Sequence, residues 1–329
     1  MKSQKISIGV IGVGHLGQHH VKHYSNMNNI NLLGVYDTDS VRGKKIATIY
    51  DTKYFEKANE LMQKCDAISI VTPTEFHYDV AKAAISNFDC NVFIEKPITE
   101  TTIQADRLIE EAKKKKLIIQ VGHIERLNPA LKVLDKYDLS PKFIDIQRLA
   151  PYTVRGTDVP VVLDLMIHDI DILLSLVQSK VKSIHASGVS ILTNSVDIAH
   201  ARIRFENGTV SSITSSRVAK DKVRKIKIFQ ENLYSTIDLL LSQTEIYNIT
   251  KNKNLIENAL HIEPFPEDNK KYIVYEKPKI DDYDPLRAEL DNFVNSTLKI
   301  EKPIVNGTAA RNALDVVIKI NEMILEDLN

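Results

Sequence analysis

The stretch GVGHLG, residues 12 to 17, constrains the fold of this chain more than any other feature. It ends an apolar run that begins at residue 5, it precedes a helix-length stretch, and it fits the pattern G-x-G-x-x-G. Its glycines are Gly12, Gly14 and Gly17. In such a turn the first glycine permits a tight bend, the second lets the backbone approach a pyrophosphate, and the third allows close packing of helix on strand. A strand, this turn and a helix in series predict a dinucleotide site, with His15 and Leu16 of the turn at the cofactor.

The first third of the sequence alternates short apolar runs with helix-length stretches. The later runs are INLLGVY (30 to 36), DAISIVT (66 to 72), CNVFIE (90 to 95) and LIIQVG (117 to 122). Continuous apolarity is typical of strands that are covered on both faces, and strands that alternate with helices indicate βαβ units. We therefore expect an α/β domain over residues 1–122, a Rossmann domain with a doubly wound parallel sheet.

The pattern changes after residue 122. Longer alternating runs such as FIDIQRL (143 to 149) and IAHARIRF (198 to 205) indicate antiparallel strands with one face turned to solvent or to a partner. Two helices close the chain, and the last is a candidate to pack back on the first domain. The sequence thus predicts that residues 123–329 form an α+β domain with a large open, mainly antiparallel sheet.

The second apolar run leads to Asp37, twenty residues after Gly17 (37 − 17). A carboxylate at this position accepts hydrogen bonds from the adenosine ribose hydroxyls and repels a 2′-phosphate, so NAD is favoured over NADP as cofactor. Arg42 complicates this prediction, because an arginine shortly after such an acid can recruit the phosphate. We expect Arg42 instead to stack near the adenine or to be solvated.

FIEKPI, residues 93 to 98, places Lys96 at the end of a predicted buried strand. Ligands of an open parallel sheet bind outside the carboxyl ends of its strands, so Lys96 is expected to point into that crevice. Pro97 keeps the backbone of Lys96 out of the α region. The alternative is a solvated lysine at a strand end, and the predicted role is a hydrogen bond to the reacting oxygen beside a nicotinamide.

LDLMIHDID, residues 163 to 171, carries Asp164 and His168 at i and i+4, which is one face of a helix. A carboxylate there can orient an imidazole, whose titration near neutral pH suits proton abstraction. Asp171 could share this face, while Asp169 points elsewhere. A purely structural polar pair on an amphipathic helix explains the pattern equally well.

Composition restricts the partners and the location. The 43 basic and 43 acidic residues cancel, so neither a nucleic-acid nor a membrane partner is expected. Cys65 and Cys90 are too few and too isolated for a disulfide framework or a zinc site. The histidines His15, His19 and His23 have metal-ligand spacing, but no carboxylate joins them and no metal is expected. No apolar run reaches the ~20 residues of a membrane span, and the sequence goes directly into a strand, so we expect a cytoplasmic protein.

Several motifs together resemble the Gfo/Idh/MocA family of NAD(P)-dependent sugar oxidoreductases, and the resemblance runs the length of the chain. The motifs are GVGHLG, Asp37, TPT at residues 72 to 74 with His77, EKP at residues 95 to 97, and DLMIHDID. The resemblance implies a catalytic group of Lys96, Asp164 and His168, and a homodimer or homotetramer formed through the sheet of the second domain. It also implies cofactor contacts by Thr72, Pro73, Thr74, His77 and Glu95. Met166 departs from many members, which have glycine there, and leaves the fit of the substrate open.

Two further segments are candidates for substrate contacts. In VGHIERLNPA (121 to 130), His123, Arg126 and Asn128 could line a cleft at the domain junction, or the arginine could only tie the two domains together. The segment RLAPYTVRG contributes Arg148, Tyr152 and Arg155. Arginines bind phosphate in a bidentate manner, which is compatible with a nucleotide sugar. Both segments are most similar to the branch of the family that contains UDP-N-acetylglucosamine 3-dehydrogenases.

Two classes of function remain open at this point. The first is an NAD-dependent dehydrogenase of a nucleotide sugar, or alternatively of a simple sugar or inositol. The second is a regulator that senses a dinucleotide without turning over a substrate, because a fold does not imply an activity. The presence of both Lys96 and His168 favours the enzyme.

Overall fold

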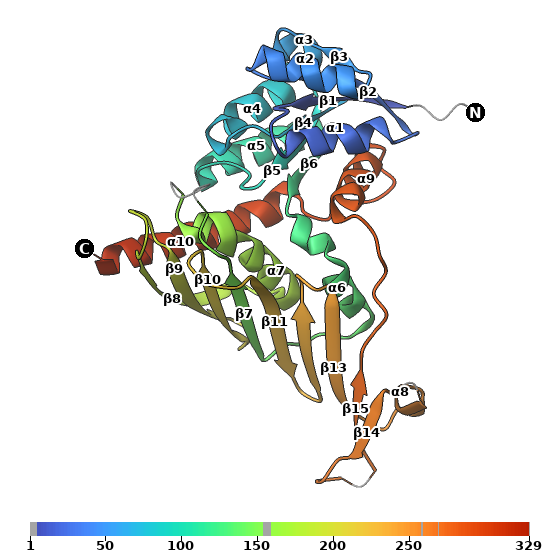
Figure 1. The fold of residues 1–329 in the computed structure, drawn as a ribbon, viewed down its shortest axis with the longest axis vertical. Coiled ribbons are helices and arrows are strands. Elements are labelled where there is room, and N and C mark those ends of the chain that lie inside the picture. Colours follow the sequence, from blue (N-terminus) through green and yellow to red (C-terminus); the bar gives the residue numbers. More distant parts are fainter. Residues whose placement is uncertain (1–4, 154–158, 258, 269, 329) are drawn as a thin grey trace. The chain divides into compact units, whose positions relative to one another are not determined.

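The computed structural model describes residues 5–153, 159–257, 259–268 and 270–328. The chain divides into two compact units, drawn in Figure 1. The first unit comprises Met1–Ile124 and Asp284–Asp315, and the second comprises Glu125–Tyr283 and Val316–Asn329. The segment 284–315, which follows the second domain in the sequence, thus belongs to the first unit.

A six-stranded parallel sheet forms the centre of the first unit, with the strand order β3-β2-β1-β4-β5-β6. Its strands are β1 (Ile6–Ile11), β2 (Ile30–Tyr36), β3 (Lys53–Tyr54), β4 (Ala67–Ile70), β5 (Asn91–Glu95) and β6 (Ile119–Gly122). The helices of this unit are α1 (Gly17–Ser25), α2 (Ser40–Ile49), α3 (Ala58–Met62), η1 (Thr74–Phe76), α4 (His77–Phe88), α5 (Thr102–Lys115) and α9 (Pro285–Thr297). This strand order is that of a doubly wound dinucleotide-binding sheet, so the predicted fold class is confirmed.

Helix α9 explains why residues from near the end of the chain join the first unit. Its side chains Leu290, Phe293 and Val294 are buried in the same apolar cluster as Ile8 of β1 and Tyr24 of α1. Burying apolar side chains stabilises this arrangement by roughly 1.5–3 kcal/mol for each large residue. A helix from the C-terminal part of the sequence therefore packs into the apolar core of the first unit.

A nine-stranded sheet forms the second unit, with the order β14-β15-β13-β12-β11-β7-β10-β9-β8. Its strands are β7 (Phe143–Leu149), β8 (Val181–Val189), β9 (Ile198–Phe205), β10 (Val210–Ser216), β11 (Val223–Gln230), β12 (Leu233–Asp238), β13 (Gln243–Thr250), β14 (His261–Pro264) and β15 (Tyr272–Glu276). All neighbouring strands pair antiparallel except β10 and β7, which are parallel. The remaining helical segments are η2 (Ile124–Leu127), α6 (Pro129–Lys132), η3 (Val133–Lys136), η4 (Val162–Met166), α7 (Ile167–Val177), α8 (Lys253–Glu257) and α10 (Gly307–Leu328). The expected large, mainly antiparallel sheet is confirmed, and among the described residues no helix has both the length and the apolarity needed to cross a membrane.

The two faces of this sheet differ in character. One face is apolar and buried, for example at Ile144 and Ile146 of β7, and α7 packs near it (Figure 1). The other face carries a row of aromatic side chains on directly paired strands, with ring centroids between 4.8 and 5.9 Å apart. The members of this aromatic row are Phe143, Phe229, Tyr234, Tyr247 and Tyr275.

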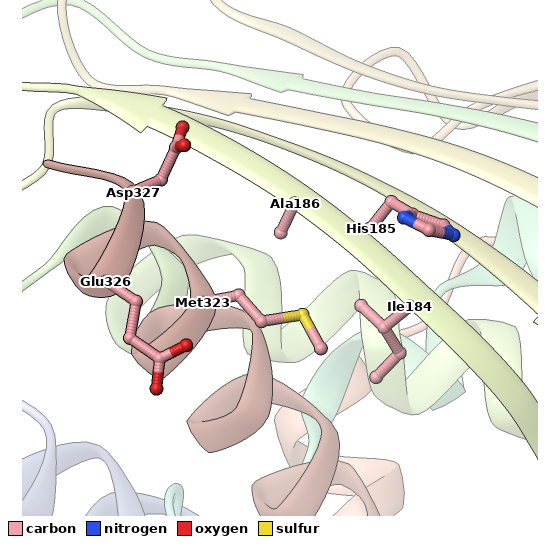
Figure 2. A pocket seen from close by; sticks show the side chains of 6 residues that line it. All are labelled: Ile184, His185, Ala186, Met323, Glu326 and Asp327. Atoms are coloured by element: carbon pink, nitrogen blue, oxygen red, sulfur yellow. The ribbon is translucent and has the colours of Figure 1, made fainter.

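A pocket of about 450 Å³ lies in the second unit between β8 and the end of α10 (Figure 2). Its lining residues are Ile184, His185, Ala186, Met323, Glu326 and Asp327. None of the predicted site residues is among them.

Candidate active site

The glycine-rich turn lies between β1 and α1, as predicted, and each glycine is needed for a different reason. Gly12 has a φ of +85°, and a Cβ there would lie 2.5 Å from the carbonyl oxygen of Val71. A Cβ on Gly17 would lie 1.9 Å from the carbonyl oxygen of Gly12, so this glycine permits the close packing of helix on turn. Beside Gly14, in contrast, a Cβ would meet no described atom within 4 Å.

The open space beside Gly14 fits a bound pyrophosphate, because a ligand can approach the backbone there. His15 and Leu16 of the turn are exposed, and no side chain caps the N-terminus of α1 or places an acidic group in its first turn. The N–H groups of Gln18 and His19 donate to the carbonyl oxygens of Gly14 and Leu16, so this helix end offers an anion its dipole and the open backbone beside Gly14. These features fit the dinucleotide cofactor that the sequence predicts.

Asp37 follows β2 and is held by four hydrogen bonds. Its carboxylate accepts from the backbone N–H groups of Val13 and Asp39, both at 2.8 Å. Arg42 donates to it through Nε at 3.1 Å and through Nη2 at 2.7 Å. Burial alone would raise the pKa of the Asp37 carboxyl, but the hydrogen bonds from Arg42 and the backbone outweigh burial, and its pKa is lowered.

Arg42 is expected to be solvated or to stack near the adenine; the structure shows it paired with Asp37, and the stacking near the adenine stays a prediction. Its guanidinium forms a bidentate pair with Asp37 while its side chain remains 44% exposed. The sequence could not indicate this pair, because residues five apart do not face each other on a helix and Asp37 lies before α2. The pair places a cation next to the predicted ribose acceptor.

The loop after β4 holds the predicted cofactor residues Thr72, Pro73 and Thr74, and His77 joins this loop to the one after β5. His77 is buried, with Nδ1 2.8 Å from the carbonyl oxygen of Pro97 and Nε2 2.9 Å from that of Thr72. Its ring therefore bridges two loops. Within the described part of the chain, the buried Thr72 Oγ1 has no hydrogen-bond partner, so this hydroxyl can serve a bound molecule.

Lys96 follows β5 and is half-buried, and its peptide bond to Pro97 is cis. The N–H of Lys96 donates to Oε2 of Glu95 at 3.3 Å, while Oε1 of Glu95 lies 3.1 Å from Nε2 of His20. The other ring nitrogen of His20 lies 2.9 Å from the hydroxyl of Ser69. A carboxylate that is ionised only accepts, so toward Glu95 the ring nitrogen Nε2 is the donor.

The sequence reasoning missed the roles of His20 and Ser69. Helical spacing could have found His20, because Gly17, His20, Val21 and Tyr24 share the buried face of α1. Gly122 of β6 leaves room for the Glu95 carboxylate, since a Cβ on Gly122 would lie 2.8 Å from Oε1 of Glu95. Buried polar groups thus fix the backbone at Lys96 from the interior of the first unit.

In the second unit, Asp164 and His168 lie in a helical stretch of mixed geometry. Asp164 belongs to the π-helical turn η4, and His168 is the second residue of α7. Wide turns of this kind occur frequently at functional sites in helices. Both side chains are half-buried. The expected α-helical spacing therefore applies to α7 but not to the turn that carries Asp164.

The neighbouring acidic residues of α7 are bound to arginines. Asp169 receives three hydrogen bonds of 2.8–3.0 Å from Arg148, and Asp171 receives bonds of 2.6 and 3.0 Å from Arg126. That Asp169 points away from the catalytic face stays a prediction. The prediction that Arg148 binds a phosphate is wrong for the structure described, because this side chain is buried and its donors are used by Asp169 and Glu125.

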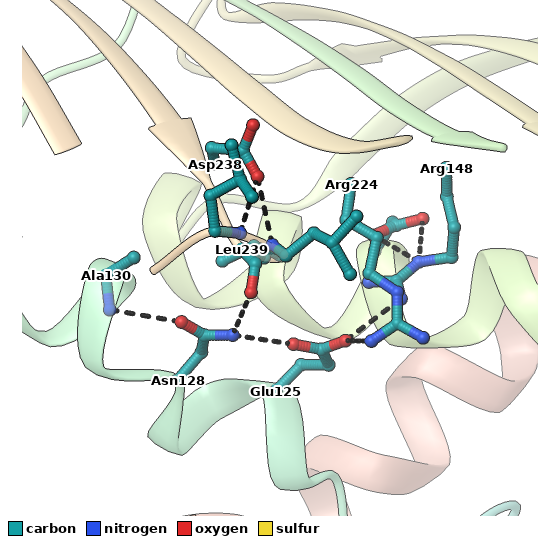
Figure 3. Close-up of polar contacts among 10 residues, drawn as sticks. Glu125, Asn128, Ala130, Arg148, Arg224, Asp238 and Leu239 are labelled. Atoms are coloured by element: carbon teal, nitrogen blue, oxygen red, sulfur yellow. Dashed lines mark hydrogen bonds and ion pairs between the residues drawn. The ribbon is translucent and has the colours of Figure 1, made fainter. Parts of the chain in front are cut away.

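Glu125 and Asn128 complete this polar network (Figure 3). One oxygen of Glu125 accepts from Arg148 at 2.9 Å and from Arg224 at 3.0 Å. Asn128 donates to the other oxygen of Glu125 and to the carbonyl oxygen of Leu239, and its own oxygen caps the N-terminus of α6. Asn128 thus has a structural role here, and its contact with a substrate stays a prediction.

The remaining predicted residues are distributed as follows. Arg126 pairs within the second unit, where Asp171 also lies. His123 is buried directly after β6, and Tyr152 is exposed. Arg155 lies outside the described residues. Their predicted substrate contacts stay predictions.

Comparison with known proteins gives the family of the chain. Residues 6–123 match the model of the oxidoreductase family with an NAD-binding Rossmann fold, and residues 150–232 match the GFO/IDH/MocA C-terminal domain. The chain is 33% identical over 313 residues to a UDP-N-acetylglucosamine 3-dehydrogenase of Acidithiobacillus ferrooxidans, covering 95% of each chain. A solved structure of that dehydrogenase superposes with a TM-score of 0.88 at 31% identity, over 99% of this chain and 100% of that one. A scyllo-inositol 2-dehydrogenase (NAD(+)) of Bacillus subtilis is 27% identical over 65% of this chain and 68% of its own length.

Proposed function

Because the chain belongs to the Gfo/Idh/MocA oxidoreductase family, we propose that it moves a hydride between NAD and a secondary hydroxyl of a nucleotide sugar, with UDP-N-acetylglucosamine as the substrate and carbon 3 as the site of oxidation. The observation that carries the proposal is the identity of 33% to a UDP-N-acetylglucosamine 3-dehydrogenase over 95% of both chains. The relatives named for inositol align over a smaller part of the chain and at lower identity.

The cofactor site of the proposal lies at the carboxyl edge of the first sheet. Gly12 follows β1, Thr72 follows β4 and Lys96 follows β5, and the carboxyl ends of parallel strands share one edge. The turn and the N-terminus of α1 would hold the pyrophosphate, and Asp37 would accept from the adenosine ribose. A bound nicotinamide supplies the acceptor for the hydride. The carboxylate of Asp37 supports NAD over NADP, since it repels a 2′-phosphate.

The proposed proton chemistry uses three residues of the family motifs, Lys96, Asp164 and His168. His168 accepts the proton of the substrate hydroxyl, Lys96 donates a hydrogen bond to the same oxygen, and Asp164 orients the imidazole. An imidazole titrates near neutral pH, which suits it as a general base, and a positioned cation stabilises the charge that develops on the oxygen. These roles follow from the positions of the residues in the family motifs.

A second candidate function is the oxidation of a simple sugar or inositol, which the inositol dehydrogenase relatives support. The two candidates are separated by incubating the protein with NAD and UDP-N-acetylglucosamine, and in parallel with free N-acetylglucosamine, glucose and myo-inositol. The proposal predicts NADH only with the UDP-sugar. NADH formed only with an unphosphorylated polyol would replace it by the second candidate.

The aromatic row supports the further proposal that two copies of the chain associate through this sheet face. Phe143, Phe229 and Tyr247 are 38%, 40% and 39% exposed, and aromatic side chains are enriched at interfaces. Tyr247→Lys would place a charge in the row and should yield a monomer in light scattering, while Lys182→Glu, outside the row, should not. An unchanged mass of the Tyr247 variant would contradict this interface.

A further inference from the structure

We propose that two ion pairs with buried carboxylates fix the rotation of the first turns of α7 and thereby the direction of the His168 ring, so that Arg126 and Arg148 are positioning residues for His168. The proposal rests on the proposed function in one respect, because it takes His168 as the proton acceptor. Neither arginine has to touch the substrate.

The helix geometry places the two pairs on opposite sides of His168. Successive residues of an α-helix are rotated by about 100°, which follows from its 3.6 residues per turn. Asp169 is thus about 100° from His168 in one direction, and Asp171 is about 60° from it in the other. A rotation of α7 about its axis would displace both aspartates, so it would stretch both pairs from their observed geometry.

Both pairs are directional, and their carboxylates are shielded from water, while the Arg126 side chain is 16% exposed. Arg148 meets both oxygens of Asp169, and Arg126 meets both oxygens of Asp171. The two aspartates are each 1% exposed. A fork of two hydrogen bonds defines an orientation, and a buried charge that loses its partner is strongly destabilising. Small rotations of α7 are therefore opposed from both sides.

The apolar contacts of α7 do not provide this control by themselves. Ile167, Ile170, Ile172 and Leu173 are fully buried on this helix. Burial of apolar surface is non-directional, so these side chains hold α7 against the sheet without defining its rotation closely. The two ion pairs therefore define the rotation of α7 about its axis more closely than its apolar contacts do.

The two pairs share one anchor, the short segment η2. Arg126 belongs to η2, and the preceding residue, Glu125, accepts a hydrogen bond from Arg148. Both arginines are therefore held by the same short backbone segment. Glu125 also separates Arg148 from Arg224, which lies directly opposite it in the ladder between β7 and β11. Like charges at opposed positions repel, and the carboxylate between them removes this cost.

A double-mutant cycle tests the proposal. Asp171→Asn and Arg126→Lys are made in the wild type and in a His168→Ala background, and kcat and KM are measured with NAD and UDP-N-acetylglucosamine. Asp171→Asn keeps the volume but weakens the pair, and Arg126→Lys keeps the charge but loses the fork. In the wild-type background each should lower kcat on the order of 10- to 100-fold with little change in KM, as expected for a displaced reacting group.

In the His168→Ala background the same two changes should alter kcat by less than about 2-fold, because effects that act through one residue are not additive. Glu276→Gln, which alters a carboxylate of the same unit bound by Asn248, is the matched control and should leave kcat unchanged. If Asp171→Asn does not fold, the kcat of Arg126→Lys in the two backgrounds tests the positioning role.

The outcomes separate this proposal from the proposed function. Equal losses of kcat in both backgrounds, or an unchanged kcat with both Asp171→Asn and Arg126→Lys, would overturn the positioning role, and a change in the Arg126–Asp171 variants has no bearing on whether His168 is the base. A His168→Ala variant that keeps the wild-type kcat would instead remove His168 as the base, whatever the Arg126 and Asp171 variants do.

Discussion

The ring of His20 and the carboxylate of Glu95 form a buried pair, with Nε2 3.1 Å from Oε1, directly before Lys96 in the chain. The His20 side chain is fully buried, and Ser69 engages its second nitrogen at 2.9 Å. Since the other oxygen of Glu95 accepts from the N–H of Lys96, the interior of the first unit determines the backbone from which this lysine extends. On the proposed function, this pair supports catalysis without touching the substrate.

His20→Leu should therefore lower both stability and turnover. The change leaves the buried Glu95 carboxylate without its donor, which costs about 1–3 kcal/mol of unfolding free energy or more for a charged group. Urea unfolding and steady-state kinetics check this expectation, with His19→Leu on the exposed face of α1 as the control. A His20→Leu variant with wild-type stability and kcat would show that the His20–Glu95 pair does not position Lys96.

Lys96→Met should bind the cofactor normally and lose turnover. The substitution removes the donor proposed for the reacting oxygen and leaves the glycine turn unchanged. A loss of kcat on the order of 100-fold or more is expected for a positioned donor or acid–base group. NADH binding followed by fluorescence serves as the control for the cofactor site, and a kcat within a few-fold of wild type would assign Lys96 a structural role.

Asp37→Ala should narrow the preference for NAD over NADP, because it removes the carboxylate that repels a 2′-phosphate. Arg42→Ala should widen that preference, since it frees the lone pairs of Asp37 and removes the cation that a phosphate could use. The ratio of kcat/KM for the two cofactors measures both effects. Tighter binding of NADPH than of NADH to the wild type would reverse the assignment.

His77 should make the stability of the protein depend on pH. Burial lowers its pKa below the ordinary value of 6.5, although the carbonyl oxygens of Pro97 and Thr72 act in the opposite direction. The unfolded state then takes up the proton first. The contribution of neutral His77 to stability is therefore complete above pH 6.5 and is lost as the pH falls from there toward the lower folded pKa.

His77→Gln should remove this part of the pH dependence, because the amide does not titrate. Urea unfolding at a series of pH values compares the variant with the wild type, and His19→Gln controls for the loss of an exposed histidine. Parallel pH profiles for the wild type and the His77 variant would contradict the assignment.

The sequence predicted those parts of the molecule that depend on local pattern. The apolar runs located five of the six parallel strands, and they missed β3 (Lys53–Tyr54), which is only two residues long. GVGHLG located the turn because a glycine with positive φ and two close backbone approaches leave few alternatives. It did not predict the partners of buried charges. From the sequence alone, Arg148 has the pattern of a surface arginine. In the structure it is buried and bound by Glu125 and by Asp169, which lies 21 residues later. His20 and Glu95 are 75 residues apart, and only the pairing of their elements brings them together. The π-helical geometry around Asp164 has no pattern in the residues that we can identify.

On the proposed function, hydride passes from carbon 3 of a UDP-sugar to NAD. UDP-N-acetylglucosamine that carries deuterium at carbon 3 tests this step, with mass spectrometry of the reduced cofactor after turnover. Deuterium in the NADH and a 3-keto sugar as product are expected. Reduced cofactor without deuterium, or a labelled sugar that returns unchanged while an inositol is oxidised, would contradict it.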